Sequence, residues 1–409
     1  MEGKKLIPKT RFREFQNEGS WKQSRMKEVV DVYDGTHQTP RYTKSGVMFL
    51  SVENIHSLKS NKYISYEDFE RNFKVFPETG DVLMTRIGDI GTANVVESDK
   101  DKAYYVTLAL LKKRDLDPYF LKENIQSVSI RKELWHRTLH IAFPKKINMD
   151  EIGKVLINYP EIREQQKIGE FFKVLDGRIA NQERKIAKVN ALKSAYLTEM
   201  FPQEGETVPK RRFKGFEGEW VVKQLSEIVY KAVDNRGKTP PLNIKGKYPI
   251  IEVISLGGRK PNYANVEKYI DEFTYSNFLR DYVEENDILF STVGRIGVVS
   301  MMDSHQYATI AQNIVGFRAK ESYEPNFLYA LFSNKLNFKR VNKIVMGAVQ
   351  PSVKVSELVK VNYLVSSSYE EQQKIGNFFK NLDNQIEMEE KKLDKLQKMK
   401  EAYLEEMFV

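Results

Sequence analysis

The sequence predicts an α+β protein with two pseudo-symmetric, mixed α/β heads, separated by two long helices that pack as an antiparallel coiled coil. Two observations lead to this prediction: a helical motif occurs twice at a fixed spacing, and weaker matches keep the same order in both halves. The chain has 409 residues, which is enough for several domains with cores of their own.

A segment of 38 residues is present twice, at 164–201 and at 371–408. At a constant offset of 207 positions, 22 of the 38 residues are identical and no gap is needed. The first copy opens with EQQKIGEFFKVLD and closes with AYLTEMF, and the second opens with EQQKIGNFFKNLD and closes with AYLEEMF. A match of this kind indicates a tandem duplication.

Apolar residues in both copies follow a heptad spacing, which predicts long amphipathic helices with one packing stripe each. The stripes are Ile168, Phe172, Leu175, Ile179, Ile186, Val189, Tyr196 and Met200, and then Ile375, Phe379, Leu382, Ile386, Leu393, Leu396, Tyr403 and Met407. Polar residues interrupt them at Gln182, Lys193, Glu389 and Lys400. Because an apolar stripe needs a partner, we expect the two helices to pack on each other. A dimerisation coiled coil with no further role is the alternative.

The rest of the chain repeats more weakly. IPKTRFREF (7–15) resembles VPKRRFKGF (208–216), GDVLMTRIGDIG (80–91) resembles NDILFSTVGRIG (286–297), and DPYFL (117–121) resembles EPNFL (324–328). Strand-like runs that enter glycine turns, together with stretches of helical period, predict mixed α and β heads. The predicted domains are residues 1–160, the central helix 161–201, residues 202–367 and the final helix 368–409.

Basic residues exceed acidic ones equally in the two heads. The net charge of the chain is +9; residues 1–160 hold 27 basic and 22 acidic residues, and residues 202–367 hold 23 and 18, so each head carries +5. Such a distribution fits a polyanion that both heads bind. An ordinary solvated surface is the alternative on charge alone.

The chain contains no cysteine, which excludes disulfides, cysteine zinc sites and thiol nucleophiles and fits a reducing compartment. The N-terminal MEGKKLIPKTRF lacks the apolar core of a secretory signal. No stretch approaches the roughly 20 apolar residues that span a bilayer. We therefore expect a cytoplasmic protein without a membrane segment.

No catalytic constellation is evident. The sequence lacks GxxxxGK[ST], a GxGxxG after a strand, and a glycine-rich loop suited to S-adenosylmethionine. His136 and His140 have metal-ligand spacing, but no Glu follows the first and the second half has no equivalent, so no metal site is expected. Asp81 and Asp287 recur without a nearby Glu-x-Lys, and we interpret them as turn residues.

Two kinds of loop carry side chains suited to base edges or phosphates. One kind is DGTHQTPRY (34–42) with DNRGKTPP (234–241), and the other is the pair of glycine turns within TRIGDIG and TVGRIG. The candidate DNA-binding residues are Thr36, His37, Gln38, Arg41 and Arg86 in the first half, and Asn235, Arg236, Lys238 and Arg295 in the second. Solvated turns are the alternative for each.

The segments 7–15 and 208–216 that open the two heads, the glycine turns and the duplicated helices together resemble the specificity subunit of Type I restriction-modification systems. The resemblance covers nearly the whole chain. The resemblance implies two target recognition domains, each reading one half of a bipartite, asymmetric double-stranded DNA target. It implies that the helices set the unread spacer and dock two methyltransferase (modification) subunits, which restriction/translocase subunits join. The assembly would act as an adenine-specific DNA methyltransferase and ATP-dependent endonuclease, with S-adenosylmethionine, ATP and Mg on partner subunits and no cofactor or catalytic site in this chain.

Gln165, Phe171, Gln372 and Phe378 lie off the predicted packing stripes, so we expect them to be free for subunit docking. Two other functions compete with DNA recognition. One is a coiled-coil scaffold for protein interactions, and the other is a self-sufficient DNA methyltransferase or nuclease, against which the missing cofactor loop argues.

Overall fold

The computed structural model describes residues 5–98, 100–235, 237, 240–279, 281–304, 307–347 and 349–409. The chain divides into two compact units: unit 1 is Met1–Glu183 with Lys391–Val409, and unit 2 is Arg184–Glu390. Each unit therefore contains the first half of one long helix, the second half of the other, and a globular part that we call its head.

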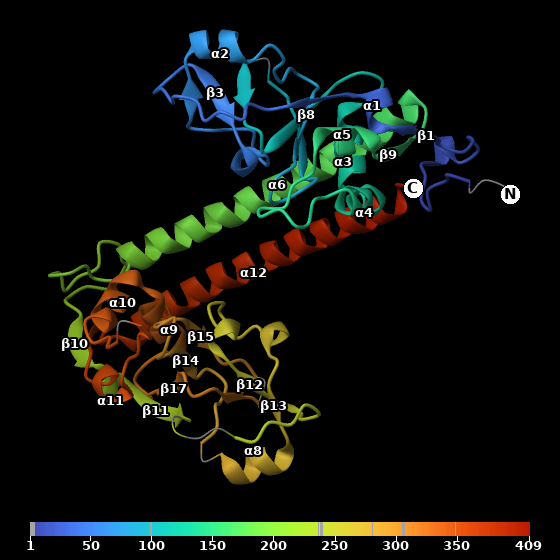
Figure 1. Ribbon diagram of the computed structural model, residues 1–409. Coiled ribbons are helices and arrows are strands. Elements are labelled where there is room, and N and C mark those ends of the chain that lie inside the picture. Colours follow the sequence, from blue (N-terminus) through green and yellow to red (C-terminus); the bar gives the residue numbers. More distant parts are fainter. Residues whose placement is uncertain are drawn as a thin grey trace. The chain divides into compact units, whose positions relative to one another are not determined.

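In the described part of unit 1, nine short strands form three sheets (Figure 1). The strands are β1 (Lys22–Arg25), β2 (Asp31–Asp34), β3 (Val47–Leu50), β4 (Tyr63–Ile64), β5 (Val82–Thr85), β6 (Ala93–Val95), β7 (Lys102–Tyr104), β8 (Leu108–Lys112) and β9 (Leu156–Tyr159). The strand orders are β2-β8-β5-β6, β4-β3-β7 and β1-β9. The helices are α1 (Met26–Val29), α2 (Tyr66–Asn72), α3 (Pro118–Gln126), α4 (Val128–His136), α5 (Met149–Lys154) and the first half of α6 (Ile162–Glu199), with 3-10 turns at Arg13–Phe15 and Val52–Asn54.

The four-stranded sheet of unit 1 is buried on both faces. Leu83 and Leu110 pack toward the three-stranded sheet, whereas Met84 and Leu111 pack toward α3, α4 and α5. Successive side chains of a strand point to opposite faces, so a strand covered on both sides needs apolar residues at every position. This accounts for the uninterrupted runs VLM in β5 and LALL in β8.

Unit 2 repeats this topology with nine strands among its described residues. They are β10 (Val221–Gln224), β11 (Val229–Asp234), β12 (Tyr248–Ile251), β13 (Tyr269–Ile270), β14 (Ile288–Ser291), β15 (Val299–Met301), β16 (Thr309–Ile310), β17 (Ile314–Ala319) and β18 (Asn362–Val365). The orders β11-β17-β14-β15, β13-β12-β16 and β10-β18 match those of unit 1 strand for strand. The helices are α7 (Leu225–Ile228), α8 (Glu272–Phe278), α9 (Pro325–Ser333), α10 (Lys335–Asn342), α11 (Val355–Leu358) and α12 (Tyr369–Glu406), with 3-10 turns at Val253–Ser255 and Tyr263–Asn265. The predicted pair of mixed heads is therefore confirmed.

The halves of α6 and α12 that share a unit run antiparallel. In unit 1 the rings of Phe171 and Tyr403 lie 4.9 Å apart, and further along Asp176 pairs with Lys400 at 2.6 Å, so numbers rise in one helix as they fall in the other. In unit 2 the ion pairs Lys185–Glu389 and Lys193–Asp383 show the same antiparallel order. Every residue of the two predicted stripes is buried or half-buried, which confirms the packing surface. None of the described helices is both long and apolar enough to cross a bilayer.

The residues that follow α12 complete an aromatic cluster of unit 1. The ring of Phe408 lies 5.5 Å from that of Phe120, 5.8 Å from Phe172 and 6.3 Å from Trp21. Phe172 comes from α6, while Phe120 and Trp21 come from the head. One aromatic side chain near the end of the sequence therefore joins three segments that are distant in the chain.

The residues that follow α6 do the same in unit 2. The ring of Phe201 lies 5.6 Å from Trp220, 5.7 Å from Phe327 and 6.1 Å from Phe379. The closing motif AYLxEMF of each repeat therefore packs in the unit that contains the opening motif EQQKIG of the other repeat. Its role in the aromatic core accounts for its presence in both copies. This explanation needs no partner protein.

Replacing Phe408 by Ala should remove this aromatic plug and lower the free energy of unfolding of unit 1 by about 4 kcal/mol. Hydrogen exchange would show faster exchange at β8 with unchanged protection at β17. Phe143→Ala is the matched control, because Phe143 is 103% exposed and should leave both strands protected. Equal loss in the two units would contradict the assignment of Phe408 to unit 1.

Candidate nucleic-acid interface

The candidate loops of unit 1 meet around Arg86, which follows β5. Its side chain is only 5% exposed, and it donates hydrogen bonds to Asp34 Oδ1 (2.9 Å), to the carbonyl of Val106 (3.0 Å) and to the carbonyl of Ile147 (3.0 Å). These partners belong to three separate segments, the end of β2, the turn between β7 and β8 and the residues before α5, and a buried guanidinium requires such pairing. Arg86 was predicted to contact DNA, but in the structure its guanidinium is buried and ties these segments together.

The loop after β2 carries the other candidates of unit 1. Nε2 of His37 lies 2.9 Å from Asp34 Oδ2, so the carboxylate that binds Arg86 also holds an exposed imidazole. Gln38 and Arg41 are exposed, whereas Thr36 is half-buried and its amide donates to a carbonyl of β7 at 3.1 Å. The structure thus brings these candidates together on one surface, with Arg86 beneath them.

The corresponding loop of unit 2 is held by Asn235. Its Nδ2 donates to Thr309 Oγ1 (3.1 Å) and to the carbonyl of Ile310 (2.8 Å), which fastens the loop to β16. Two further candidates, Arg236 and Lys238, lie outside the described residues. The role of Asn235 is therefore largely to position the loop.

The two glycine turns are equivalent, but their arginines are not. The carbonyl of Arg86 accepts the amide of Ile147, and in unit 2 the carbonyl of Thr292 accepts the amide of Val353 in the same way. Thr292, and not Arg295, is therefore the counterpart of Arg86. Arg295 is exposed in the turn itself. Both turns need glycine because their glycines have φ between 74° and 90°, the left-handed region.

A second pair of loops was missed in the sequence. Antiparallel bridges join Leu139 with Lys146 and Met346 with Ser352, and each closes a small loop; position 348 in the second loop lies outside the described residues. Each loop also bridges to the glycine turn of its own head. The available signal was compositional: neither loop contains Asp or Glu.

The two carboxylates interpreted as turn residues have that role. Asp81 and Asp287 are buried, and each accepts a hydrogen bond at 2.8 Å from the amide three residues earlier. Lys112 balances the first charge and Arg318 the second, both at 2.8 Å. In the part of the chain that is described, no group of three His, Cys, Asp or Glu side chains is placed to hold a metal ion.

The repeated motif EQQKIG forms the joint between each head and its helix. Glu164 is fully buried and accepts two hydrogen bonds from Arg11, at 2.6 and 2.7 Å. Its counterpart Glu371 is bound in the same way by Arg212, at 2.6 and 2.9 Å. Bidentate arginine–carboxylate pairs are strong and directional, and both arginines belong to the weakly repeated head openings.

The next residue of the motif binds the N-cap residue of a short helix in the head. Oε1 of Gln165 accepts the amide of Asp117 at 2.9 Å, at the start of α3, and Oε1 of Gln372 accepts the amide of Glu324 at 3.0 Å, at the start of α9. The glutamines are 2% and 1% exposed. The structure corrects the expectation that they are free for docking, because their amide groups are buried and bonded within the chain.

The two phenylalanines expected to be free are also packed. Phe171 is half-buried, 5.8 Å from the ring of Phe12. Phe378 lies 5.0 Å from Tyr196 and 6.0 Å from Phe213. Heptad positions alone did not reveal this packing, because each ring lies between a stripe tyrosine of the other long helix and a phenylalanine of the head.

A buried charge cluster continues the joint in unit 1. Asp176 binds Lys122 and Lys400, and Lys122 also pairs with Glu123 at 2.8 Å. Burial by itself would raise the pKa of the Asp176 carboxyl, but the charges of the two lysines outweigh it, so the pKa lies below its ordinary value. Burial would likewise lower the pKa of Lys122, but the carboxylates of Glu123 and Asp176 raise it.

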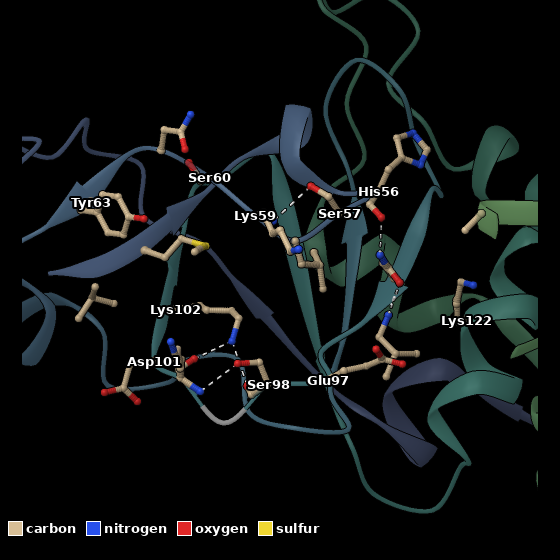
Figure 2. A pocket seen from close by; sticks show the side chains of 18 of the residues that line it. His56, Ser57, Lys59, Ser60, Tyr63, Glu97, Ser98, Asp101, Lys102 and Lys122 are labelled. Carbon is tan, nitrogen blue, oxygen red and sulfur yellow. Dashed lines mark hydrogen bonds between the residues drawn. The ribbon is translucent and has the colours of Figure 1, made fainter. Parts of the chain in front are cut away.

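A cavity of about 1250 Å³ in unit 1 borders this cluster (Figure 2). Figure 2 shows Lys102 turned toward the neighbouring backbone, where its Nζ donates to the carbonyls of Ser98 (2.9 Å) and Lys100 (2.6 Å). Lys102 is bonded to backbone carbonyls and Lys122 is paired with carboxylates, so both of these lining lysines stabilise the cavity wall. Among the described residues, none of the predicted DNA contacts lines this cavity.

The Type I restriction modification DNA specificity domain is the family whose model matches the chain, at residues 18–191 and 217–398. The chain therefore belongs to this family. A Methanocaldococcus jannaschii protein described as the MjaX type I restriction enzyme specificity subunit is 22% identical over 402 residues, which cover 94% of this chain and 92% of that protein.

Two solved structures share the fold. The S subunit of the Type I restriction-modification system from M. genitalium is 14% identical, with a TM-score of 0.65 and 99% of both chains covered. A chain from a study of complex assembly and conformational transition of the type I R-M system is also 14% identical, with a TM-score of 0.51 and 94% of this chain and 96% of that chain covered.

Asp176→Asn should lower the free energy of unfolding of unit 1 by about 2 kcal/mol at neutral pH, because two lysines then share one carboxylate. A carboxyl with a lowered pKa contributes stability above its unfolded pKa and loses it as the pH falls through the folded value. The difference between wild type and variant should therefore shrink below about pH 4. Urea unfolding followed by tryptophan fluorescence would measure it. Asp394→Asn, on the exposed face of α12, is the control and should change little.

Arg86→Met should leave one carboxylate and two carbonyls without their donor, at a cost of about 3 kcal/mol. The amide of Ile147 and the loop after β2 should lose protection from hydrogen exchange. Arg41→Met removes an exposed cation from the same surface and should leave exchange unchanged. Unchanged exchange in the Arg86 variant would show that the three loops hold their positions without it.

Proposed function

We propose that this chain is a non-catalytic subunit that supplies DNA sequence recognition to a Type I restriction-modification assembly. Each head would read one half of a bipartite, asymmetric duplex target. Support comes from one observation: both heads present the same loops from the same strand topology, while the side chains on these loops differ. A repeated frame with changed contact residues is suited to two different half-sites.

The exposed candidates supply the contacts in this proposal. His37, Gln38 and Arg41 in head 1 and Arg295 in head 2 face solvent, and their side chains can pair with base edges or phosphates. Arg86 would act as a positioning residue beneath them. The equal charge of the heads, +5 each in residues 1–160 and 202–367, would strengthen binding to either half-site in a salt-dependent way.

The long helices would set the unread gap and dock two methyltransferase subunits. Some positions are identical in the two helical repeats and exposed in both. These are better docking candidates than the identical buried positions, because the joint and the aromatic cores already explain why the buried residues are the same. Gln166 with Gln373 and Lys188 with Lys395 are such pairs. S-adenosylmethionine, ATP and Mg would belong to the partner subunits, restriction/translocase subunits would join them, and the assembly would work in the cytoplasm.

Methylome sequencing of a cell that makes this chain together with a methyltransferase subunit tests the proposal. We expect a new adenine motif with two specific halves around a fixed gap, absent when the methyltransferase subunit is made alone. Exchanging residues 1–160 for another head should change one half of the motif only. If the assembled complex produces no new motif, the chain is better explained as a protein-interaction scaffold.

A further inference from the structure

Two of the most exposed large apolar side chains in the described structure lie on one small loop of head 1. Ile141 is 99% exposed and Phe143 is 103% exposed. In the matching loop of head 2, Val349 is 100% exposed and Met346 is 53% exposed. Apolar side chains normally gain by leaving water, so a repeated arrangement that keeps them outside suggests a ligand that covers them.

The loop of head 1 is held firmly at its base. The amide of Leu139 donates to the carbonyl of Lys146 at 2.8 Å, and the amide of Gly88 in the glycine turn donates to the carbonyl of Lys145 at 2.8 Å. The residue after the loop, Ile147, is fully buried. The exposed tip is therefore presented by a fixed stem.

The loop of head 2 is held in the same way. Met346 and Ser352 exchange two backbone hydrogen bonds at 2.9 Å, and the amide of Gly294 donates to the carbonyl of Pro351 at 2.9 Å. Val353, the counterpart of Ile147, is buried. Although the loops share almost no sequence, both heads place an apolar tip beside their glycine turn.

The sequence segments that carry the two tips contain basic residues and no acidic ones, although Lys343 pairs with Glu204 at 3.8 Å. No acidic residue occurs between Arg137 and Met149, a stretch that contains Lys145 and Lys146. None occurs between positions 341 and 356 in head 2, where the basic residues are at 343 and 354. Nζ of Lys145 lies 4.4 Å from the centre of the exposed Trp135 ring. This combination of positive charge and apolar or aromatic surface complements the phosphates and base faces of a nucleic acid.

The tips also adjoin the proposed DNA contacts. Arg86 binds both Asp34, which holds His37, and the carbonyl of Ile147 at the end of the first loop. In head 2 the exposed Arg295 belongs to the glycine turn that bonds to the second loop. A duplex held by these residues would therefore lie against the apolar tips.

We propose that the tips of loops 139–146 and 346–352 are wedges that enter the duplex between base pairs, one in each half-site, and unstack the step that they enter. Apolar side chains are used in this way by proteins that open or kink DNA. This proposal rests on the proposed function, since it assumes that the heads bind duplex DNA. It adds that each head deforms its own half-site, so that the stacking energy of that step contributes to sequence preference.

The test uses the full chain assembled with its methyltransferase subunits, without S-adenosylmethionine, on duplexes of the motif found by methylome sequencing. The fluorescent base 2-aminopurine is placed at successive positions across both half-sites and their flanks. The variants are Ile141→Ala with Phe143→Ala, Met346→Ala with Val349→Ala, and Phe143→Leu, which keeps an apolar tip. Tyr66→Ala on α2, 64% exposed in the same head, is the control for losing an exposed aromatic residue.

We expect wild type to raise fluorescence at one step in each half-site. The head 1 double variant should lose the signal in its half only and bind about tenfold more weakly, and the head 2 double variant should do the reverse. Phe143→Leu and Tyr66→Ala should behave like wild type. If a double variant still binds the motif specifically and its fluorescence signal is unchanged, the wedge proposal is wrong but the proposed function stands. If a double variant fails to assemble with the methyltransferase subunits in the absence of DNA, the tips contact protein and the wedge proposal is also wrong. Failure of wild type to bind the motif would overturn the proposed function as well.

Discussion

A fully buried carboxylate bound by an arginine, at the point where each head meets its own helix, is the interaction on which the rest of the structure depends. Glu164 with Arg11, and Glu371 with Arg212, remove two charges from water and must therefore stay paired. The following glutamine accepts the amide of the residue that caps a helix of the head, and the glycine of the motif allows that N-cap residue to approach, since a Cβ at Gly169 would meet Asp117. Together these contacts fix the orientation of a head on its helix, and with it the orientation of every loop that the head carries.

Much of the framework could be predicted from the sequence because it rests on local periodicity. The heptad spacing revealed both long helices and their packing stripes, and the duplication revealed two heads of one kind. The positions of Arg86 and Gln165 could not be predicted in this way, because burial by distant segments decides their roles. A glycine turn with an arginine looks like a phosphate site until Asp34 and Ile147 close over it. The exposed loops were missed because an apolar tip of two residues has no periodic signature.

The two units also show which parts of such a protein are free to vary. The joint, the aromatic plug and the interhelical ion pairs recur at equivalent positions, with Asp176–Lys400 in unit 1 and Lys193–Asp383 in unit 2. Buried polar pairs in a helix interface add more to register than to stability. The loops between strands share their anchoring hydrogen bonds and the glycines of their turns, whereas their exposed side chains differ and can change without disturbing the frame. Adaptation to a new ligand can therefore proceed one head at a time.

The aromatic plug at Phe408 has a consequence for how the protein is made. Proteins usually complete their N-terminal domain first as the chain leaves the ribosome. Here unit 2 is one continuous stretch, 184–390, whereas unit 1 requires residues 391–409 to close its core. The head that is synthesised first is thus the last to be completed. Its aromatic residues stay without Phe408 until the whole of unit 2 has been translated. A chain interrupted after residue 390 would carry one completed unit and one open hydrophobic core.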